Sequence, residues 1–341
     1  TLKVDNPKVN EAYISEVKED IDLNYISLIS VGNQEYQKYL KSLICILILL
    51  SSTFLMSCSD ISNNVTNNIN KNNTTNNISN TKKPSSSNSG MLVHYINVGQ
   101  GDAELIQVNG KNMLIDAGPR SNEKDIISYL DKLKIKKLDY VIASHPHEDH
   151  IGNMATIINK YEIGKFYAPK VETTTRTFEN MIKALKKKNL KINVIKEGTS
   201  TIDLGKNTKV LVFSPKADGY GKKTNLNNYS PIMKLVYGNT SFLFTGDAET
   251  VEENYVLEKN YNLKADVLKL GHHGSSTSTS EKFLKAVDPS IAIVSCGVNN
   301  TYGHPHKETI QKLQKYNIKV YRTDKNGNIV LQSNGKTITK K

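Results

Sequence analysis

The segment SHPHEDHIG, residues 144–152, constrains the fold of this chain more than any other feature. It follows LDYVIAS, an apolar run with the composition of a buried β-strand, so the polar cluster must lie where that strand ends. Pro146 forces a turn, and Gly152 closes it. The chain is therefore expected to fold so that the end of a buried strand carries a dense group of metal-binding side chains.

The candidate metal ligands in this segment are His145, His147, Asp149 and His150. Alternate residues of an extended segment point to the same side, so His145 and His147 can approach one metal ion together. A helical turn that begins near Asp149 would aim Asp149 and His150 at a neighbouring position. Imidazole nitrogen and carboxylate oxygen are suitable ligands for zinc, manganese or iron. A structural role alone does not explain this density, and the pattern predicts a metal centre.

From Met91 onward the chain alternates strand-like and helix-like segments. The Asn-Gly pair at residues 109–110 separates the strand-like runs AELIQV and NMLIDAG and predicts a β-hairpin. EKDIISYLDKLKI, residues 123–135, has apolar side chains at helical spacing. The alternation continues to residue 333 in two similar halves. It predicts an α+β fold of four layers, αββα, in which two sheets pack face to face with helices outside.

HPHEDH, residues 145–150, resembles the HxHxDH signature of the metallo-β-lactamase superfamily. The other motifs of that superfamily follow in order along the chain. Asp116 in MLIDAG resembles the aspartate that braces the metal-binding loop, and Asp247 in FLFTGD resembles the carboxylate that bridges two metal ions. The resemblance implies the same four-layer fold.

GHHGS, residues 271–275, resembles the late histidine motif of the superfamily. We favour His273 as the ligand without excluding His272. Five segments together are similar to the hydrolase domain of the ComEC competence family: NVGQGDAELI, SHPHEDHIG, FLFTGDAE, LKLGHHGSSTS and NNTYGHPH. This resemblance covers essentially all of residues 91–341.

The resemblance implies a catalytic centre with two divalent ions, Zn²⁺ or Mn²⁺. One ion would be bound by His145 and His147, the other by Asp149, His150 and His273, and Asp247 would bridge them. Such a pair can hold a bridging hydroxide and stabilise both the attacking and the leaving oxygen of a phosphodiester. Asp149 is also a candidate to accept the proton of the attacking water.

One departure from the family pattern concerns the first ion. Many superfamily members supply another histidine between the opening motif and the bridging aspartate, yet residues 151–246 contain none. The matching place falls in NNYSP, where Asn228 and Ser230 are candidate weak ligands or pocket-lining residues. The first ion would then have an incomplete protein shell, with room for water or a substrate oxygen.

Four further residues are candidates for roles around the centre. His304 and His306 in YGHPH are expected either to meet the substrate or protonate its leaving group, or to form a hydrogen-bonded loop pair. Ser275 is a candidate to orient phosphate oxygens, although a serine in a polar turn is often only solvated. Asp102 in GQGD is expected to brace its turn rather than to bind metal.

Phosphodiester hydrolysis is the leading hypothesis, and the ComEC resemblance makes DNA the expected substrate. Residues 1–90 contain eight basic and eight acidic residues, so the net charge of +12 lies in residues 91–341 and favours a polyanionic partner. The alternatives are hydrolysis of a phosphocholine-bearing wall or lipid polymer and a noncatalytic surface receptor for DNA. β-Lactam hydrolysis is disfavoured because the intermediate histidine is missing and Cys296 follows the late histidine motif. No obligate protein partner is expected.

Residues 38–58 resemble a bacterial lipoprotein signal peptide. Lysines precede an uncharged apolar run, residues 42–57, which is short for a spanning helix but fits a signal-peptide core. The run ends in LMSC, which resembles a lipobox, so that Cys58 would carry the lipid anchor. An uncleaved membrane anchor is the alternative. Either reading places the body of the protein outside the cytoplasm.

Two flanking segments complete the domain prediction. Residues 1–37 are interpreted as an N-terminal extension that reflects an overextended or truncated start. Residues 59–90 are rich in Asn, Ser and Thr and have too few large apolar side chains to form a core, so they are expected to be a disordered tether. The catalytic domain is predicted to occupy residues 91–341.

Overall fold

The computed structural model describes residues 90–220 and 225–341. The predicted N-terminal extension, the signal peptide with Cys58 and the tether up to residue 89 lie outside these ranges. Within the described ranges, no helix is both long enough and apolar enough to cross a membrane.

Two β-sheets pack face to face. The eight strands of the first sheet, in spatial order, are β14 (Ile338–Lys340), β13 (Ile329–Ser333), β1 (Met91–Tyr95), β2 (Glu104–Val108), β3 (Lys111–Ile115), β4 (Lys137–Ile142), β5 (Glu162–Ala168) and β6 (Ile192–Val194). The six strands of the second sheet are β12 (Lys319–Arg322), β11 (Ile291–Val294), β10 (Val267–Lys269), β9 (Thr240–Phe244), β8 (Met233–Tyr237) and β7 (Thr208–Val212).

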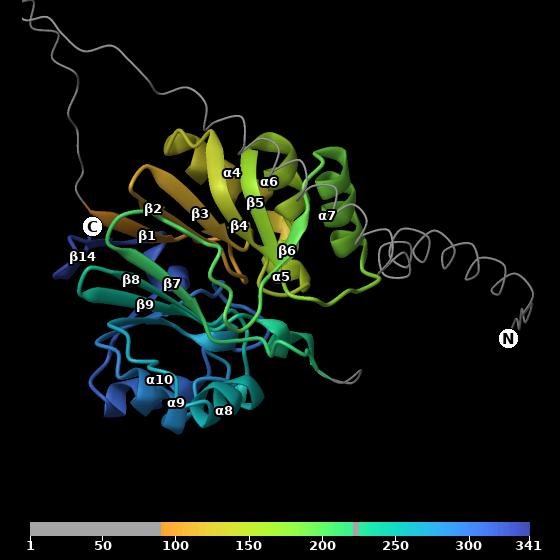
Figure 1. Cartoon of the computed structure of the whole chain (residues 1–341). Helices are drawn as coiled ribbons and strands as arrows, with labels where there is room; N and C mark the ends of the chain where they lie inside the picture. Colours follow the sequence, from red (N-terminus) through yellow and green to blue (C-terminus); the bar gives the residue numbers. More distant parts are fainter. Residues whose placement is uncertain (1–89, 221–224) are drawn as a thin grey trace, which may run out of the picture. The chain divides into compact units, whose positions relative to one another are not determined.

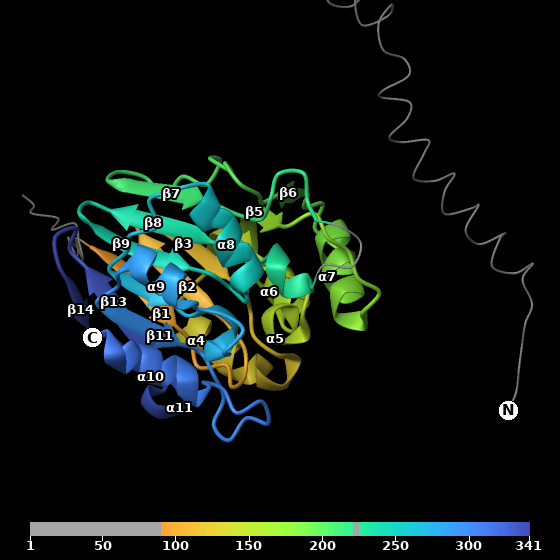
Figure 2. The ribbon, with the colours of Figure 1, turned by 90° about the horizontal axis from the view of Figure 1, so that it is seen from below.

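Helices cover the outer face of each sheet. The first sheet is covered by α4 (Glu123–Lys132), α6 (Met154–Lys160) and α7 (Arg176–Lys187), and the second by α8 (Thr250–Glu258), α9 (Glu281–Val287) and α10 (Lys307–Lys315), as Figure 1 shows. Seen from below, α8, α9 and α10 lie over the second sheet (Figure 2). The short helical turns are η1 (Arg120–Asn122), α5 (Glu148–Ile151), η2 (Leu226–Tyr229), η3 (Gly271–Gly274) and α11 (Thr323–Asn326). The predicted four-layer αββα fold is confirmed.

Three apolar layers hold the sandwich together. The middle layer lies between the sheets, where the rings of Tyr95 and Phe244 stack with their centroids 6.3 Å apart. A second layer packs α4, α6 and α7 onto the first sheet, and a third packs α8, α9 and α10 onto the second. Complete burial of a side chain such as Phe244 contributes about 1.5–3 kcal/mol. Both sheets are thus apolar on both faces.

The predicted hairpin connects β2 and β3. Its two turn residues, Asn109 and Gly110, have φ angles of 53° and 75°. Positive φ at both central positions matches the right-handed twist of the flanking strands, which pair antiparallel with Val108 opposite Lys111. The hairpin prediction is confirmed.

The sequence pattern did not predict α6 or β5. Gly164 interrupts the apolar pattern of β5. A glycine is needed here, because a Cβ at this position would lie 2.5 Å from the backbone oxygen of Asp139. The close approach lets β5 pair in parallel with both β4 and β6. The glycine that the contact with β4 requires therefore breaks the apolar pattern by which β5 could have been predicted.

Parallel strands direct the polar segments to one edge of each sheet. In the first sheet β3 and β4 are parallel, and in the second β9, β10 and β11 are parallel. The carboxyl ends of parallel strands meet at the same edge. Asp116 and the SHPHEDHIG segment follow β3 and β4, whereas Asp247 and η3 follow β9 and β10. Contacts between these loops show that the two edges face each other.

Candidate metal centre

The loop after β4 holds two histidines toward a common point. His145 Nε2 and His147 Nδ1 lie 2.9 Å apart, as the extended spacing predicted. α5 then begins at Glu148, so Asp149 and His150 project from a helical turn. His145 and His150 are buried, whereas Asp149 reaches the cavity with a third of its side chain exposed.

Asp116 braces this loop. Its carboxylate accepts hydrogen bonds from the backbone N–H of Ser144 at 2.7 Å and from the Ser144 hydroxyl at 2.6 Å. It also lies 2.8 Å from His150 Nδ1. With Nδ1 occupied in this way, His150 directs Nε2 toward the centre. Asp116 therefore orients the ring of His150, a candidate ligand.

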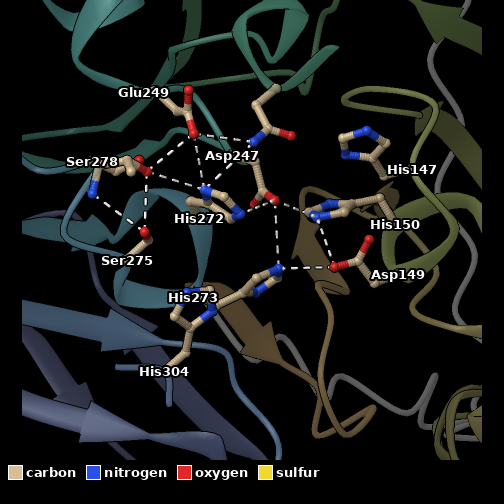
Figure 3. Close-up of polar contacts among 12 residues, drawn as sticks. His147, Asp149, His150, Asp247, Glu249, His272, His273, Ser275, Ser278 and His304 are labelled. Carbon is tan, nitrogen blue, oxygen red and sulfur yellow. Dashed lines mark hydrogen bonds and ion pairs between the residues drawn. The ribbon is translucent and has the colours of Figure 1, made fainter. Parts of the chain in front are cut away.

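Asp247 lies between the histidines of the two sheets. Its Oδ2 is 3.2 Å from His150 Nε2 and 3.8 Å from His145 Nε2. From the second sheet, His273 Nε2 lies 3.5 Å away and His272 Nε2 lies 3.8 Å away. Figure 3 shows the carboxylate between the rings of His150 and His272. Four ring nitrogens thus surround one carboxylate oxygen.

His273 joins the second sheet to the metal loop. Its Nε2 lies 3.2 Å from Asp149 Oδ2, and its Nδ1 donates to the backbone oxygen of Ser295 at 3.0 Å. The same Nδ1 is 3.3 Å from Asp102 Oδ1. Asp102 is therefore placed beside a ligand histidine, and it does more than brace its own turn.

Lys269 is a buried residue of this network that the sequence analysis missed. Its Nζ lies 2.6 Å from Asp102 Oδ2 and donates to the Leu270 oxygen at 2.9 Å. Burial alone would lower the pKa of Lys269, but the adjacent Asp102 outweighs it and raises that pKa. Burial raises the pKa of neighbouring Glu104 well above its usual value. The available signal was a lysine inside the apolar run VLKL.

His272 also faces the centre. Both His272 and His273 have positive φ angles, 47° and 54°, in a turn that aims both rings at Asp247 (Figure 3). His272 Nδ1 lies 3.3 Å from Glu249 Oε1, and its Nε2 faces Asp247. A carboxylate behind a histidine is the usual arrangement for an oriented metal ligand. The structure therefore brings both histidines of the pair to the centre.

Opposite charges shift the pKa values of the ligands. Burial opposes ionisation of Asp247, but His150 and His273 outweigh it and hold the pKa of Asp247 well below its usual value. Burial likewise opposes the charged form of His273, but Asp247 and Asp102 raise the pKa of His273 to about 10. The pKa of His150 is raised for the same kind of reason, whereas burial lowers the pKa of His145. A cation bound here would replace the protons on raised-pKa imidazoles such as that of His273.

The donor set fits divalent metal ions. His150 Nε2 and Asp247 Oδ1 are buried and make no hydrogen bond within the described ranges. One ligand atom from each of Asp149, His150, Asp247 and His273 lies within 4.8 Å of the others. Two unsatisfied buried atoms among nitrogen and oxygen donors are expected where a cation binds. The cluster is therefore a candidate metal site.

A cavity of about 340 Å³ opens onto these ligands. It is lined by Gln100, His147, Glu148, Asp149, Asn227, Asp247, His272, His273, Tyr302 and His304. Asn227, rather than the predicted Asn228, forms part of its wall. Asn228 is buried and its side-chain oxygen accepts from the Glu249 N–H at 3.2 Å.

Two predicted substrate-binding serines are buried beside the cavity. The Ser230 hydroxyl lies 3.2 Å from His145 Nδ1 and accepts from the Asp247 N–H at 3.0 Å, so it orients two ligand residues. The Ser275 hydroxyl lies 3.1 Å from that of Thr277. Neither serine belongs to the cavity wall.

His304 lines the cavity, whereas His306 lies behind it. The side-chain amide of Gln100 lies 3.3 Å from His304 Nδ1. Burial, with the neighbouring His273 and His272, lowers the pKa of His304 to about 4. His304 is therefore neutral near pH 7 and is suited to hydrogen bonding rather than to storing a proton. His306 contacts Ser276 and Tyr302.

The four-layer fold and the ligand cluster at the facing sheet edges define a metal-dependent hydrolase. Residues 96–298, more than half of the chain, match the model of the metallo-beta-lactamase superfamily. The chain belongs to the metallo-β-lactamase superfamily.

The relatives include competence proteins. The chain is 34% identical over 255 residues to ComE operon protein 3 of Bacillus subtilis, covering 70% of this chain and 32% of the relative. It is 33% identical over 247 residues to Recombination protein 2 of Haemophilus influenzae, covering 70% and 28%. It is 30% identical over 231 residues to Competence protein ComA of Neisseria gonorrhoeae, covering 67% and 30%. The chain thus spans about a third of the length of these relatives. The resemblance to the hydrolase domain of competence proteins is confirmed.

Proposed function

We propose that this chain is a binuclear-metal phosphodiesterase that hydrolyses DNA. The observation that carries the proposal is the position of Asp247, whose Oδ2 lies 3.2–3.8 Å from four histidine nitrogens contributed by both sheets. A carboxylate between two nitrogen sets is suited to bridge two cations. When bound, two divalent cations would polarise the phosphoryl group, lower the pKa of a water and stabilise the leaving oxygen.

The ligand residues divide into two groups around Asp247. His145 and His147 would hold one cation, and Asp149, His150 and His273 would hold the other. Asp149 lines the cavity with about a third of its side chain exposed, so it is placed to accept the proton of an attacking water. His304, neutral near pH 7, would hydrogen-bond a phosphate or leaving oxygen.

A basic hollow beside the metal loop supports a polyanionic substrate. Lys183 and Lys187 lie one turn apart on α7 and, with Arg120 and a single acidic residue, Glu123, line a hollow of about 330 Å³ that includes Gly152. Exposed cations next to a phosphodiesterase centre would bind the flanking phosphates of a nucleic acid, and this binding should weaken as salt rises. Relatives named as competence and recombination proteins also favour DNA.

We also propose that the enzyme works outside the cytoplasm, held at the membrane by a lipid on Cys58. The proposal rests on the lysines, the apolar run and the LMSC motif of residues 38–58. Its test is metabolic labelling with a fatty-acid analogue. The label should enter the protein and be absent from a Cys58→Ala variant.

The activity is tested with the full chain stripped of metal and reloaded with Mn²⁺ or Zn²⁺. Single- and double-stranded DNA are incubated with this protein and with an Asp247→Ala control. Cleavage that requires both metal and Asp247 supports the proposal. Metal binding with hydrolysis of a phosphocholine ester but not of DNA would contradict it, and metal-independent DNA retention without cleavage would favour a receptor.

A further inference from the structure

An exposed tyrosine stands at the mouth of the metal cavity. Tyr302 lines the cavity, yet 65% of its surface is exposed to solvent. Its ring stacks on that of His304 with centroids 5.6 Å apart and an interplanar angle of 19°. We call this pair the aromatic shelf. One face of the Tyr302 ring is covered by His304, and so the shelf offers its other face to a ligand.

Hydrogen bonds hold the shelf in place. Asn300 accepts from the His304 N–H at 2.9 Å and donates to the oxygens of His304 and Gly297. His306 Nδ1 accepts from the Ser276 N–H at 2.9 Å, so the proton of a neutral His306 lies on Nε2. Nε2 can then donate to the backbone carbonyl oxygen of Tyr302 at 3.2 Å. These bonds fix the backbone of the loop that carries Tyr302, so less conformational entropy is lost when a ligand stacks on its ring.

The shelf lies beside the reacting centre. The His304 ring is 6.0 Å from the His273 ring and 5.4 Å from the His272 ring, measured between centroids. Tyr302, Asp149 and Asp247 line the same cavity, so a group stacked on Tyr302 would share that cavity with a phosphate held by the two carboxylates. Histidines aside, Tyr302 is the one aromatic residue among the described residues that line the cavity.

A single open aromatic face fits a planar partner. Recognition of a choline cation commonly uses a cage of several aromatic rings, whereas a nucleobase stacks on one. In a duplex both faces of a base are already covered by its neighbours, so a base must be unpaired or flipped out to stack on a protein ring.

We infer that Tyr302 binds the nucleobase next to the scissile phosphodiester and makes the enzyme selective for unpaired strands. The inference rests on the proposed DNA hydrolysis and adds the substrate class. Tyr302 supplies a stacking surface, and His306 positions it through the backbone of the same loop.

The first test compares kcat/KM for the metal-loaded wild type and for Tyr302→Ala, Tyr302→Phe and Val298→Ala. The substrates are a single-stranded oligonucleotide, its duplex, and the same single strand with abasic sites flanking the cleaved bond. Tyr302→Ala should lower kcat/KM on the single strand by about 5- to 150-fold, the loss expected for one stacked base. Tyr302→Phe should retain activity, and Val298→Ala, an exposed neighbour in the same loop, should match wild type.

The abasic strand separates stacking from loop damage. Wild type should cleave it as poorly as Tyr302→Ala cleaves the normal strand, and Tyr302→Ala should cause no further loss on it. Equal losses on the normal and abasic strands, or a wild-type preference for duplex, would overturn the inference.

A binding measurement decides the question even if no DNA is cleaved. Stacking on Tyr302 should quench the fluorescence of a 2-aminopurine oligonucleotide bound to metal-free wild type and to Tyr302→Phe, but not to Tyr302→Ala. Quenching without cleavage by the metal-loaded enzyme would reject the proposed nuclease while keeping the base-binding shelf. Unchanged quenching in Tyr302→Ala, or loss of phosphocholine-ester hydrolysis in that variant, would reject the shelf as a base site.

Discussion

The two sheets orient their histidines in different ways. In the first sheet, His150 is held by Asp116, which follows the adjacent strand β3. In the second sheet, His273 is held by the Ser295 carbonyl and by Asp102, which belongs to the loop between β1 and β2 of the first sheet. Asp102 is in turn neutralised by Lys269 of the second sheet. The first brace is local to one sheet, whereas the second exists only once the sheets have packed.

We therefore expect the contact of Asp102 and Lys269 with His273 to affect mainly the stability of the fold. The contact of Asp116 with His150 should affect mainly metal affinity. Asp116 is satisfied by Ser144 and His150, which lie within a few residues of each other. Asp102 and Lys269 form a buried ion pair across the sheet interface, each with 1% of its side chain exposed. A buried charge that loses its partner is costly, because neither water nor a counterion replaces it. The following variants test that division.

The largest expected effect is on folding. Lys269→Met should lower the free energy of unfolding by about 3–5 kcal/mol, because it leaves the buried Asp102 carboxylate without its lysine partner. Urea unfolding of the full chain measures the change. Lys264→Met removes an exposed lysine paired with Asp288 and should change stability by less than about 0.5 kcal/mol. The double variant Asp102→Asn/Lys269→Met should recover most of the loss. An equal effect of Lys269→Met and Lys264→Met would contradict a cross-sheet brace.

A smaller effect separates the two braces by metal affinity. Asp116→Asn should weaken Zn²⁺ binding by about 10- to 100-fold, because the new amide donates to His150 Nδ1 and leaves the proton on Nε2, the atom that faces Asp247. Asp102→Asn/Lys269→Met should weaken it less, since the Ser295 carbonyl still fixes the tautomer of His273. Competition with a chromophoric chelator gives both affinities. If Asp102→Asn/Lys269→Met lost more Zn²⁺ affinity than Asp116→Asn, the assignment of metal affinity to the Asp116 contact would be wrong.

The smallest effect is a release of protons. Asp247 and Asp102 raise the pKa of His273 to about 10, so this imidazole carries a proton near pH 7 without metal, and the pKa of His150 is raised in the same direction. Metal binding should therefore release about one proton per braced histidine, and affinity should rise with pH until it approaches about 10, the pKa of His273. Calorimetry in two buffers of different ionisation enthalpy counts the protons. No release at pH 7 would show that the braces do not hold protonated histidines.

Much of the site was predictable because its ligands cluster in the sequence. His145, His147, Asp149 and His150 occupy one short segment, and the strand before it sets their direction. The hairpin at Asn109 and Gly110 and the four layers followed from turn chemistry and apolar spacing. These features depend on neighbours along the chain, so their physical cause can be read locally.

Tertiary structure decided the features that depend on contacts across the sandwich. Lys269 meets Asp102 across 167 positions of the chain, and Gly164 was needed for its approach to Asp139. Nothing in NNYSP distinguishes Asn227, which lines the cavity, from Asn228, which does not. The sequence by itself determined which side chains can offer metal donors, since donor chemistry belongs to the residue. Only packing determined which histidines lie around Asp247, which are hydrogen-bonded by Asp116 or Asp102, and which face the cavity. These contacts depend on how closely the edges of the two sheets approach each other.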